Sequence, residues 1–282
     1  MNLRRLTART AVAGVATAVA AGALVGISAT AANAVENTTT YACTAAGSPV
    51  GDFALKVSTP VVPPTATAGQ SFPPGLLSLD ATVTIPATLA PTLGGAGVNG
   101  GRVDDYAAML GTTAIKAPLK FGAPAPNPDG SVTMTGTGAN EAFTLPASGT
   151  YKVQLPSSFV FTPTTAAGDF PVTVACTSAA PGDLGSIEIT KAPSTLKAKV
   201  KKAGKKYQVT VKVKGDENQA ELPTGKVTAK YGKKKVTKKV ANGKAVIKLP
   251  KAAAGKKVKI SYSGDGYVAK SKTSVKIKKA KK

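Results

Sequence analysis

Alternation of apolar and polar side chains is strictest in the run YQVTVKVK, residues 207–214. Its apolar members Tyr207, Val209, Val211 and Val213 fall on one face, and its polar members fall on the other. A period of two with one apolar face is typical of a half-buried β-strand. The same period recurs on both sides of this run, at residues 196–201, 227–231, 245–249, 258–262 and 275–277.

Turns separate these runs, and each of them contains glycine. The turn signals are Ala203-Gly204, Gly215-Asp216, Tyr231-Gly232, Asn242-Gly243 and residues 264–266. About seven short strands in roughly 90 residues predict an immunoglobulin-like β-sandwich over residues 186–282.

Several short motifs in this region are similar to those of the bacterial Ig-like repeat domains of cell-surface proteins. They are TKAPST at residues 190–195, PTGKV at 223–227, GKA at 243–245 and YSGDGY at 262–267, followed by Ser271. The resemblance covers residues 190–278 and implies a spacer or adhesion module without catalysis. The lysine density is a departure from it, and the single copy does not make a long stalk.

Residues 35–185 are rich in Pro, Gly, Ala and Thr and contain short alternating runs at residues 53–57, 81–85 and 151–155. Short strands separated by Pro and Gly turns predict an antiparallel β-sandwich. The whole chain is therefore expected to be all-β, with two sandwich domains. One short helix is expected over residues 104–110.

Two cysteines, Cys43 and Cys176, lie near the ends of this region. In an oxidising compartment we expect them to form a disulfide, because each is the other's only partner within the chain. Two free thiols or an intermolecular bond are the alternatives. Around them, YACT at residues 41–44, a Pro-rich strand over 57–70 and VACT at 174–177 resemble a secreted actinobacterial domain of unknown function. That resemblance covers residues 38–178 and implies a β-rich extracellular module.

The net charge of +23 is distributed very unevenly. Residues 1–34 carry +3, residues 35–185 carry −4, and residues 186–282 carry +24 from 29 lysines and five acids. This shift in composition places a domain boundary near residue 185. The last region contains no arginine, so its cations are point charges on flexible stems, which suit general attraction to polyanions.

The first 34 residues combine three arginines, an apolar run and the small-residue site Ala32-Asn33-Ala34. This pattern predicts a secretory signal peptide cleaved after Ala34, with an uncleaved membrane anchor as the alternative. The apolar run is weakly hydrophobic and short for a bilayer, which favours the signal. We therefore expect a secreted or cell-surface protein.

Catalytic and cofactor motifs are weak. The chain has no histidine and two cysteines, so we expect no metal site and no cofactor. The glycine pattern at residues 95–100 lacks the βαβ context of a dinucleotide site. Ser194 and Lys197 have the spacing of a serine–lysine nucleophile, but a strand points them to opposite faces. The adjacent acids Asp104-Asp105 and Asp216-Glu217 are typical of capping residues and solvated charge, although distant acids can meet in a hydrolase cleft.

The lysines have two interpretations. They can protect strand edges and keep the protein soluble, or they can bind an anionic polymer such as teichoic acid, acidic polysaccharide or extracellular DNA. Sequence-specific nucleic-acid recognition is not expected, since no arginine, tryptophan or groove-fitting helix is present here. The contact residues predicted for a polyanion are Lys233, Lys234, Lys235, Lys238, Lys239, Lys278, Lys279, Lys281 and Lys282.

These observations favour a non-enzymatic, exported structural or adhesion protein, held by charge to the cell envelope. The alternative is that the N-terminal domain binds a carbohydrate or a protein, for which the aromatic candidates are Tyr106, Phe121, Phe159 and Phe161. A hydrolase with scattered carboxylates is the third, weaker hypothesis.

Overall fold

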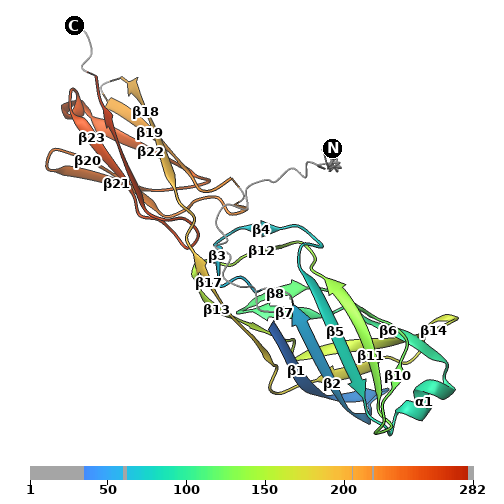
Figure 1. The fold of residues 1–282 in the computed structure, drawn as a ribbon. Helices are drawn as coiled ribbons and strands as arrows, with labels where there is room; N and C mark the ends of the chain where they lie inside the picture. The colour runs from blue at the N-terminus through green and yellow to red at the C-terminus, as the bar shows by residue number, and fades with distance from the viewer. Residues whose placement is uncertain (1–34, 60–61, 205, 218, 279–282) are drawn as a thin grey trace, which may run out of the picture.

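A computed structural model describes residues 35–59, 62–204, 206–217 and 219–278, so the predicted signal peptide lies outside the described residues. The regular secondary structure of the described residues is almost all β-strand, which confirms the all-β prediction. Figure 1 shows two β-rich parts, one formed by the strands up to β17 and the other by the strands from β18 onward.

The main sheet of the N-terminal part closes on itself. Strand β9 pairs with both β6 and β11, so eight of the described strands form a ring in which every neighbouring pair is antiparallel. Closure leaves the ring without an open edge, and β10 and β15 extend it locally. The ring order is β1 (Val35–Ala45), β2 (Ser48–Thr59), β5 (Ser78–Ile85), β11 (Val132–Ala139), β9 (Leu119–Phe121), β6 (Val98–Val103), β14 (Ser158–Thr165) and β16 (Val174–Thr177), with β10 at Ala125–Pro126 and β15 at Gly168–Asp169.

Alternation fills this ring with apolar side chains. Phe53, Leu55 and Val57 of β2 are buried, and the exposed Lys56 between them points to the other side. The interior also holds Tyr41, whose hydroxyl donates a hydrogen bond of 2.8 Å to the Pro156 carbonyl oxygen. Burial raises the pKa of Tyr41 to about 12. The closed sheet is thus antiparallel, as predicted for this region, and the pairing of β9 with β11 adds the closure.

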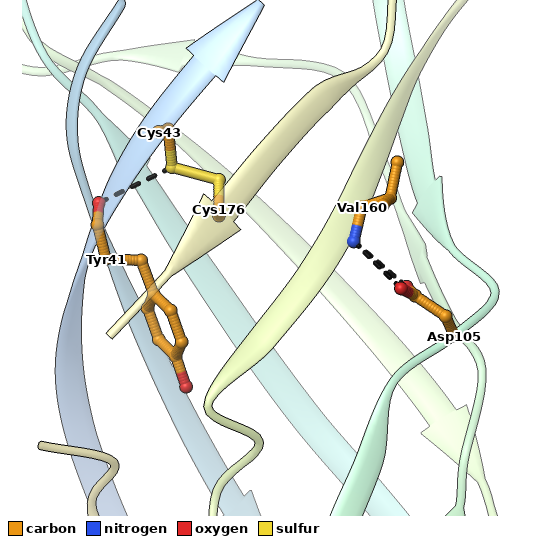
Figure 2. The surroundings of a disulfide bond; sticks show 5 residues. All are labelled: Tyr41, Cys43, Asp105, Val160 and Cys176. Atoms are coloured by element: carbon orange, nitrogen blue, oxygen red, sulfur yellow. Dashed lines mark hydrogen bonds between the residues drawn. A yellow bond between two sulfur atoms is a disulfide. The ribbon is translucent and has the colours of Figure 1, made fainter. Parts of the chain in front are cut away.

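The predicted disulfide joins Cys43 of β1 to Cys176 of β16 (Figure 2). The two residues lie directly opposite each other in the register of these adjacent strands, with their Cα atoms 4.1 Å apart. Both are buried in the closed sheet. The Sγ atom of Cys43 lies 3.4 Å from the Tyr41 carbonyl oxygen, which is a contact only, because a disulfide sulfur carries no proton.

A second, smaller layer packs beside the closed sheet. It contains a five-stranded sheet in the order β3-β17-β13-β7-β8, in which only the β17–β3 pair is parallel, and a two-stranded pair of β4 and β12. Their bounds are β3 (Thr65–Thr67), β17 (Asp183–Thr190), β13 (Gly149–Gln154), β7 (Ala107–Leu110), β8 (Thr113–Lys116), β4 (Ser71–Phe72) and β12 (Phe143–Thr144).

The helix expected over residues 104–110 is wrong. Residues 107–110 form β7, because alternate side chains there are buried and the strand pairs on both sides, with β8 and β13. The described helix is instead α1 (Ala90–Gly95), with Pro91 in its first turn. Proline is tolerated at that position because the first N–H groups of a helix have no partner within the helix.

The C-terminal part is a sandwich of a three-stranded and a four-stranded sheet. The orders β18-β19-β22 and β21-β20-β23-β24 match the immunoglobulin-like arrangement of seven antiparallel strands in two packed sheets. All the alternating apolar residues predicted for residues 207–262 are buried, which confirms the predicted faces. The bounds are β18 (Thr195–Ala203), β19 (Lys206–Lys214), β20 (Lys226–Tyr231), β21 (Lys234–Lys239), β22 (Lys244–Pro250), the 3₁₀ turn η1 (Lys251–Ala253), β23 (Lys257–Tyr262) and β24 (Ser271–Lys276).

The two parts contact each other through loops of the sandwich. The side-chain Nε2 of Gln219 donates to the Ala68 carbonyl oxygen of the N-terminal part at 3.3 Å, and to the Tyr267 carbonyl oxygen of the sandwich at 3.2 Å. The Ala220 N–H donates to the Gly69 carbonyl oxygen at 3.0 Å. The charge boundary near residue 185 falls inside β17, which pairs with the N-terminal strands β13 and β3. The sandwich therefore begins only after β17, several residues later in the sequence than the change in charge.

Candidate polyanion-binding surface

A row of lysines crosses the outer face of the four-stranded sheet. Lys235 of β21 lies opposite Lys230 of β20, and Lys230 lies opposite Lys259 of β23. Directly opposed residues on antiparallel strands have their Cβ atoms about 5 Å apart. All three side chains are exposed, so three ammonium groups are held side by side on neighbouring strands.

More lysines flank this row on the same face. Lys239 lies opposite Lys226, and Lys257 lies opposite Lys276. A row of hydroxyl residues runs between the lysine rows, and in it the Thr228 and Thr237 hydroxyl oxygens lie 2.9 Å apart. We call this outer surface the lysine face; its lysines are Lys226, Lys230, Lys235, Lys239, Lys257, Lys259, Lys272 and Lys276.

The three-stranded sheet carries a similar row on its own outer face. Lys197 of β18 lies opposite Lys212 of β19, and Lys212 lies opposite Lys244 of β22. At the next outward position, Lys199 of β18 lies opposite Thr210 of β19, and Thr210 lies opposite Val246 of β22, so the positive charge continues on β18 alone. This side of the sandwich therefore holds one compact row of three lysines.

Within the part of the chain that the structure describes, no lysine of the lysine face forms an ion pair with a carboxylate. The four ion pairs found among the described residues all belong to the N-terminal part, around Lys56, Arg102 and Lys152. Like charges directly opposed across strands destabilise a sheet. The sandwich therefore maintains a repulsive arrangement that an anionic ligand would relieve.

One acid of the sandwich, Asp265, is fully committed to holding loops at the end of the four-stranded sheet. Its carboxylate accepts hydrogen bonds from the backbone N–H groups of Thr224 (2.6 Å), Val268 (2.7 Å) and Tyr267 (2.9 Å), and from the Tyr262 hydroxyl (2.9 Å). Burial alone raises the pKa of Asp265, but these hydrogen bonds together hold it below its ordinary value. The carboxylate thus fixes the connection between β23 and β24 against the start of β20.

The predicted contact residues are divided by the structure. Lys235 and Lys239 belong to the lysine face, whereas Lys234 and Lys238 lie on the opposite side of β21, together with the half-buried Val236. Lys233 occupies the turn between β20 and β21, next to Gly232 with its φ of 57°. Lys278 is exposed just after β24. The remaining predicted contacts lie outside the described residues: Lys279, Lys281 and Lys282.

Sequence reasoning missed Lys226, Lys230, Lys257 and Lys259 as members of one surface. It favoured the consecutive lysines of residues 233–239, although consecutive residues of a strand point to opposite faces. The available signal was the spacing of lysine at every second or fourth residue in β20 and β23. What brings these lysines together is the pairing of strands, which the sequence pattern does not specify.

Other candidate sites are occupied by structural interactions. The Ser194 hydroxyl donates to the Ala269 carbonyl oxygen at 2.7 Å and lies 2.6 Å from the Ser271 hydroxyl. Asp105 accepts hydrogen bonds from the Val160 N–H at 3.0 and 3.2 Å (Figure 2), and Asp104 pairs with Arg102. The glycine pattern at residues 95–100 runs from the end of α1 into β6, the reverse of the order that a dinucleotide site needs.

The aromatic residues considered for a ligand patch on the N-terminal domain are core residues. Each of them is at most 6% exposed: Tyr106, Phe121, Phe159 and Phe161. They therefore do not form a surface for carbohydrate. Among the described residues, no cluster of three or more acids or cysteines could hold a metal ion. The same part of the chain contains no helix of the length and apolarity needed to cross a membrane.

Comparisons with solved structures give loose likenesses. A Corynebacterium diphtheriae protein described as membrane anchored is 13% identical, with a TM-score of 0.36; the likeness covers 88% of this chain, which spans only 59% of that one. The chicken CNTN1 FN1–FN3 domains are 12% identical, with a TM-score of 0.24, and the likeness covers 88% of this chain and 96% of that one. Both TM-scores are too low to carry an argument about the fold.

No curated protein matches the sequence. Residues 40–188 match a family of unknown function, DUF6801, and this range contains nearly all of the closed sheet and the smaller layer beside it. The match agrees with the resemblance of residues 38–178 to a domain of unknown function. Because it spans more than half of the chain, the protein belongs to the family of unknown function DUF6801.

Proposed function

We propose that the protein is an exported, non-enzymatic surface protein whose C-terminal sandwich binds anionic polymers through the lysine face. The observation that carries this proposal is the row formed by Lys235, Lys230 and Lys259 across three adjacent strands. A polymer with a negative charge on each repeat can contact several of these ammonium groups at once. The disulfide supports export, because such bonds persist in oxidising compartments.

Edge protection does not account for the lysines on the two central strands of the lysine face. Outward lysines protect a sheet from unwanted pairing when they lie on its edge strands. Lys226 and Lys230 belong to β20 and Lys259 to β23, which are the two central strands of the sheet. Central strands have no free edge, so edge protection is not a reason for their lysines, which supports a role for the surface that they form.

The chemistry of the side chains defines the class of partner. The lysine face lacks arginine, whose planar fork recognises phosphate or carboxylate in a fixed geometry. Ammonium groups on flexible stems attract any closely spaced row of negative charges. We therefore propose a general polyanion of the cell envelope, such as teichoic acid, acidic polysaccharide or extracellular DNA, without sequence-specific recognition.

The proposal is tested with a variant that lacks one lysine row. Its affinity for a polyanion is compared with that of a control variant that loses the same number of charges elsewhere. Lys230→Thr, Lys235→Thr and Lys259→Thr together remove the row and retain residues that favour strands. At roughly 0.5 kcal/mol for each exposed ionic contact, affinity for isolated teichoic acid should fall about tenfold. The control carries Lys56→Thr, Lys116→Thr and Lys120→Thr in the N-terminal part, and it should keep its affinity.

Retention is measured on immobilised teichoic acid, acidic polysaccharide and DNA in parallel at physiological salt. A tenfold loss confined to the row variant supports the lysine face. Equal losses in the row variant and the control would show that only net charge matters. If the unaltered protein binds none of the three polymers, the proposed function is refuted.

A further inference from the structure

The N-terminal part contains a cavity of about 100 Å³ between the closed sheet and the smaller layer beside it. Its walls come from both sides: Leu79 of β5 lies on the closed sheet, and Leu110 of β7, Ile115 of β8 and Ile187 of β17 lie on the five-stranded sheet. The walls are formed by secondary structure on both sides, so the cavity is a built feature of the fold.

The cavity has almost no hydrogen-bonding capacity. Among the described residues that line it, Thr59 and Asn140 are the ones with polar side chains. The Asn140 oxygen accepts a hydrogen bond from the Leu77 N–H at 2.7 Å, and its nitrogen donates to the carbonyl oxygens of Pro73 at 2.9 Å and Glu141 at 2.7 Å. Because Asn140 is already engaged, the lining favours an apolar occupant over water, which needs several polar partners.

Apolar surface continues from the cavity toward solvent. Phe72 of β4 and Phe143 of β12 line it, and their rings stack with centroids 4.9 Å apart and planes inclined by 9°. Both rings are only partly buried. Leu77 lines the cavity, and the adjacent Leu76 is 52% exposed. The short β4–β12 pair therefore borders the cavity with partly accessible apolar side chains.

We propose that this cavity binds the end of an alkyl chain. Its volume is about two-thirds of the roughly 150 Å³ of an apolar protein cavity that admits benzene, which suits an alkyl group of a few carbons. The site lies in the DUF6801 region and does not depend on the lysines of the sandwich. It gives the N-terminal part a ligand of its own, of a class opposite to the polyanions proposed for the C-terminal part.

The test uses uncharged ligands, so that the lysines cannot contribute. The full protein with labelled methyl groups is titrated with 1-alkanols from butanol to octanol and followed by NMR. The methyl signals of Ile115 and Ile187, which line the cavity, should shift, whereas that of Ile247 in the sandwich core should not. Affinity should rise about fourfold for each added methylene and level off once the cavity is full.

Matched variants on one strand locate the site. Ala108 of β7 lines the cavity and Ala107 faces the other side of the strand, so Ala108→Leu should weaken binding at least tenfold and Ala107→Leu should leave it unchanged. Leu110→Ala enlarges the cavity and should move the levelling-off to longer alkanols. Since the alkanol series on the unaltered protein needs no variant, it remains decisive even if Ala108→Leu fails to fold.

Two results would overturn the proposal. One is the absence of any shift at Ile115 and Ile187 in the folded, unaltered protein up to the solubility limit of the alkanols. The other is an equal shift at Ile247, which would indicate non-specific partitioning into both cores.

Discussion

The closed sheet and the C-terminal sandwich are both all-β, yet they present different surfaces to the solvent. The closed sheet encloses aromatic rings and a disulfide, and its region of the chain is slightly acidic. The sandwich packs mainly Val, Ile and Ala between its sheets and directs rows of lysine outward. The difference shows that alternation fixes the core of each part, while the outward positions remain free to carry charge for another purpose.

The largest expected effect comes from removing the disulfide, which belongs to the closed sheet. Replacing both cysteines, by Cys43→Ala with Cys176→Ala, should cost the N-terminal part about 2–5 kcal/mol of unfolding free energy. The reason is that the bond joins positions 133 residues apart and restricts the unfolded chain. Hydrogen exchange during urea unfolding should show lost protection in β1 and β16 and unchanged protection in β19 and β22. Equal loss in the sandwich would mean that the two parts unfold as one unit.

The next effect concerns the acid that anchors the sandwich loops. Asp265→Asn should destabilise the sandwich by about 2 kcal/mol at pH 7, because it weakens hydrogen bonds to a charged acceptor. The pKa of Asp265 in the folded protein is held below the unfolded value of about 3.9, so the ionised carboxylate stabilises the folded sandwich above that pH. This stabilisation is lost as the pH falls through the folded-state pKa.

Urea midpoints of the sandwich measured at pH 7 and at successively lower pH values below about 3.9 check this expectation. The variant and the unaltered protein should differ at pH 7 and converge in acid. The control is Asp216→Asn, which makes the same change of charge at an exposed loop position of the sandwich. A pH-independent difference for Asp265→Asn would contradict the role given to the carboxylate.

The smallest expected effect is a gain in stability rather than a loss. Lys230→Thr should stabilise the sandwich by about 0.5 kcal/mol at low salt, because Lys230 lies opposite lysines on both neighbouring strands. The gain should disappear at 1 M salt, where charges are screened beyond about 3 Å. Lys248→Thr is the control, since Lys248 lies opposite Gln208. The melting temperatures of both variants are measured at low and high salt. An equal gain in melting temperature for Lys230→Thr and Lys248→Thr at low salt would contradict the repulsive arrangement.

The sequence predicts the fold where side-chain period is the deciding signal. The buried faces of β19, β20, β22 and β23 follow from alternation alone, and the disulfide follows from the number and placement of the cysteines. The closure through β9 does not follow, since its three residues carry too short a pattern to reveal two partners. Residues 107–110 were misread as helix because neighbouring strands, which no local pattern encodes, determine their conformation.

The candidate surface was predictable only in part. Charge counting located it in the sandwich, but the contact residues depend on strand register. Lys230 meets Lys235 across a tight hairpin, whereas its meeting with Lys259 requires the pairing of β20 with a strand nearly 30 residues away. The apolar cavity had no sequence signal, since it lies between two layers whose packing is defined only in three dimensions.

The lysine face is tested most directly by the salt dependence of binding to one defined polyanion. Association constants for a single-stranded oligonucleotide are measured across a salt series for the unaltered protein and for the variant with Lys230, Lys235 and Lys259 replaced by Thr. Each neutralised phosphate contributes about 0.7 to the slope of log affinity against log salt, so the variant's slope should be shallower by about two. Parallel lines for the two proteins, or binding that salt does not weaken, would contradict the account.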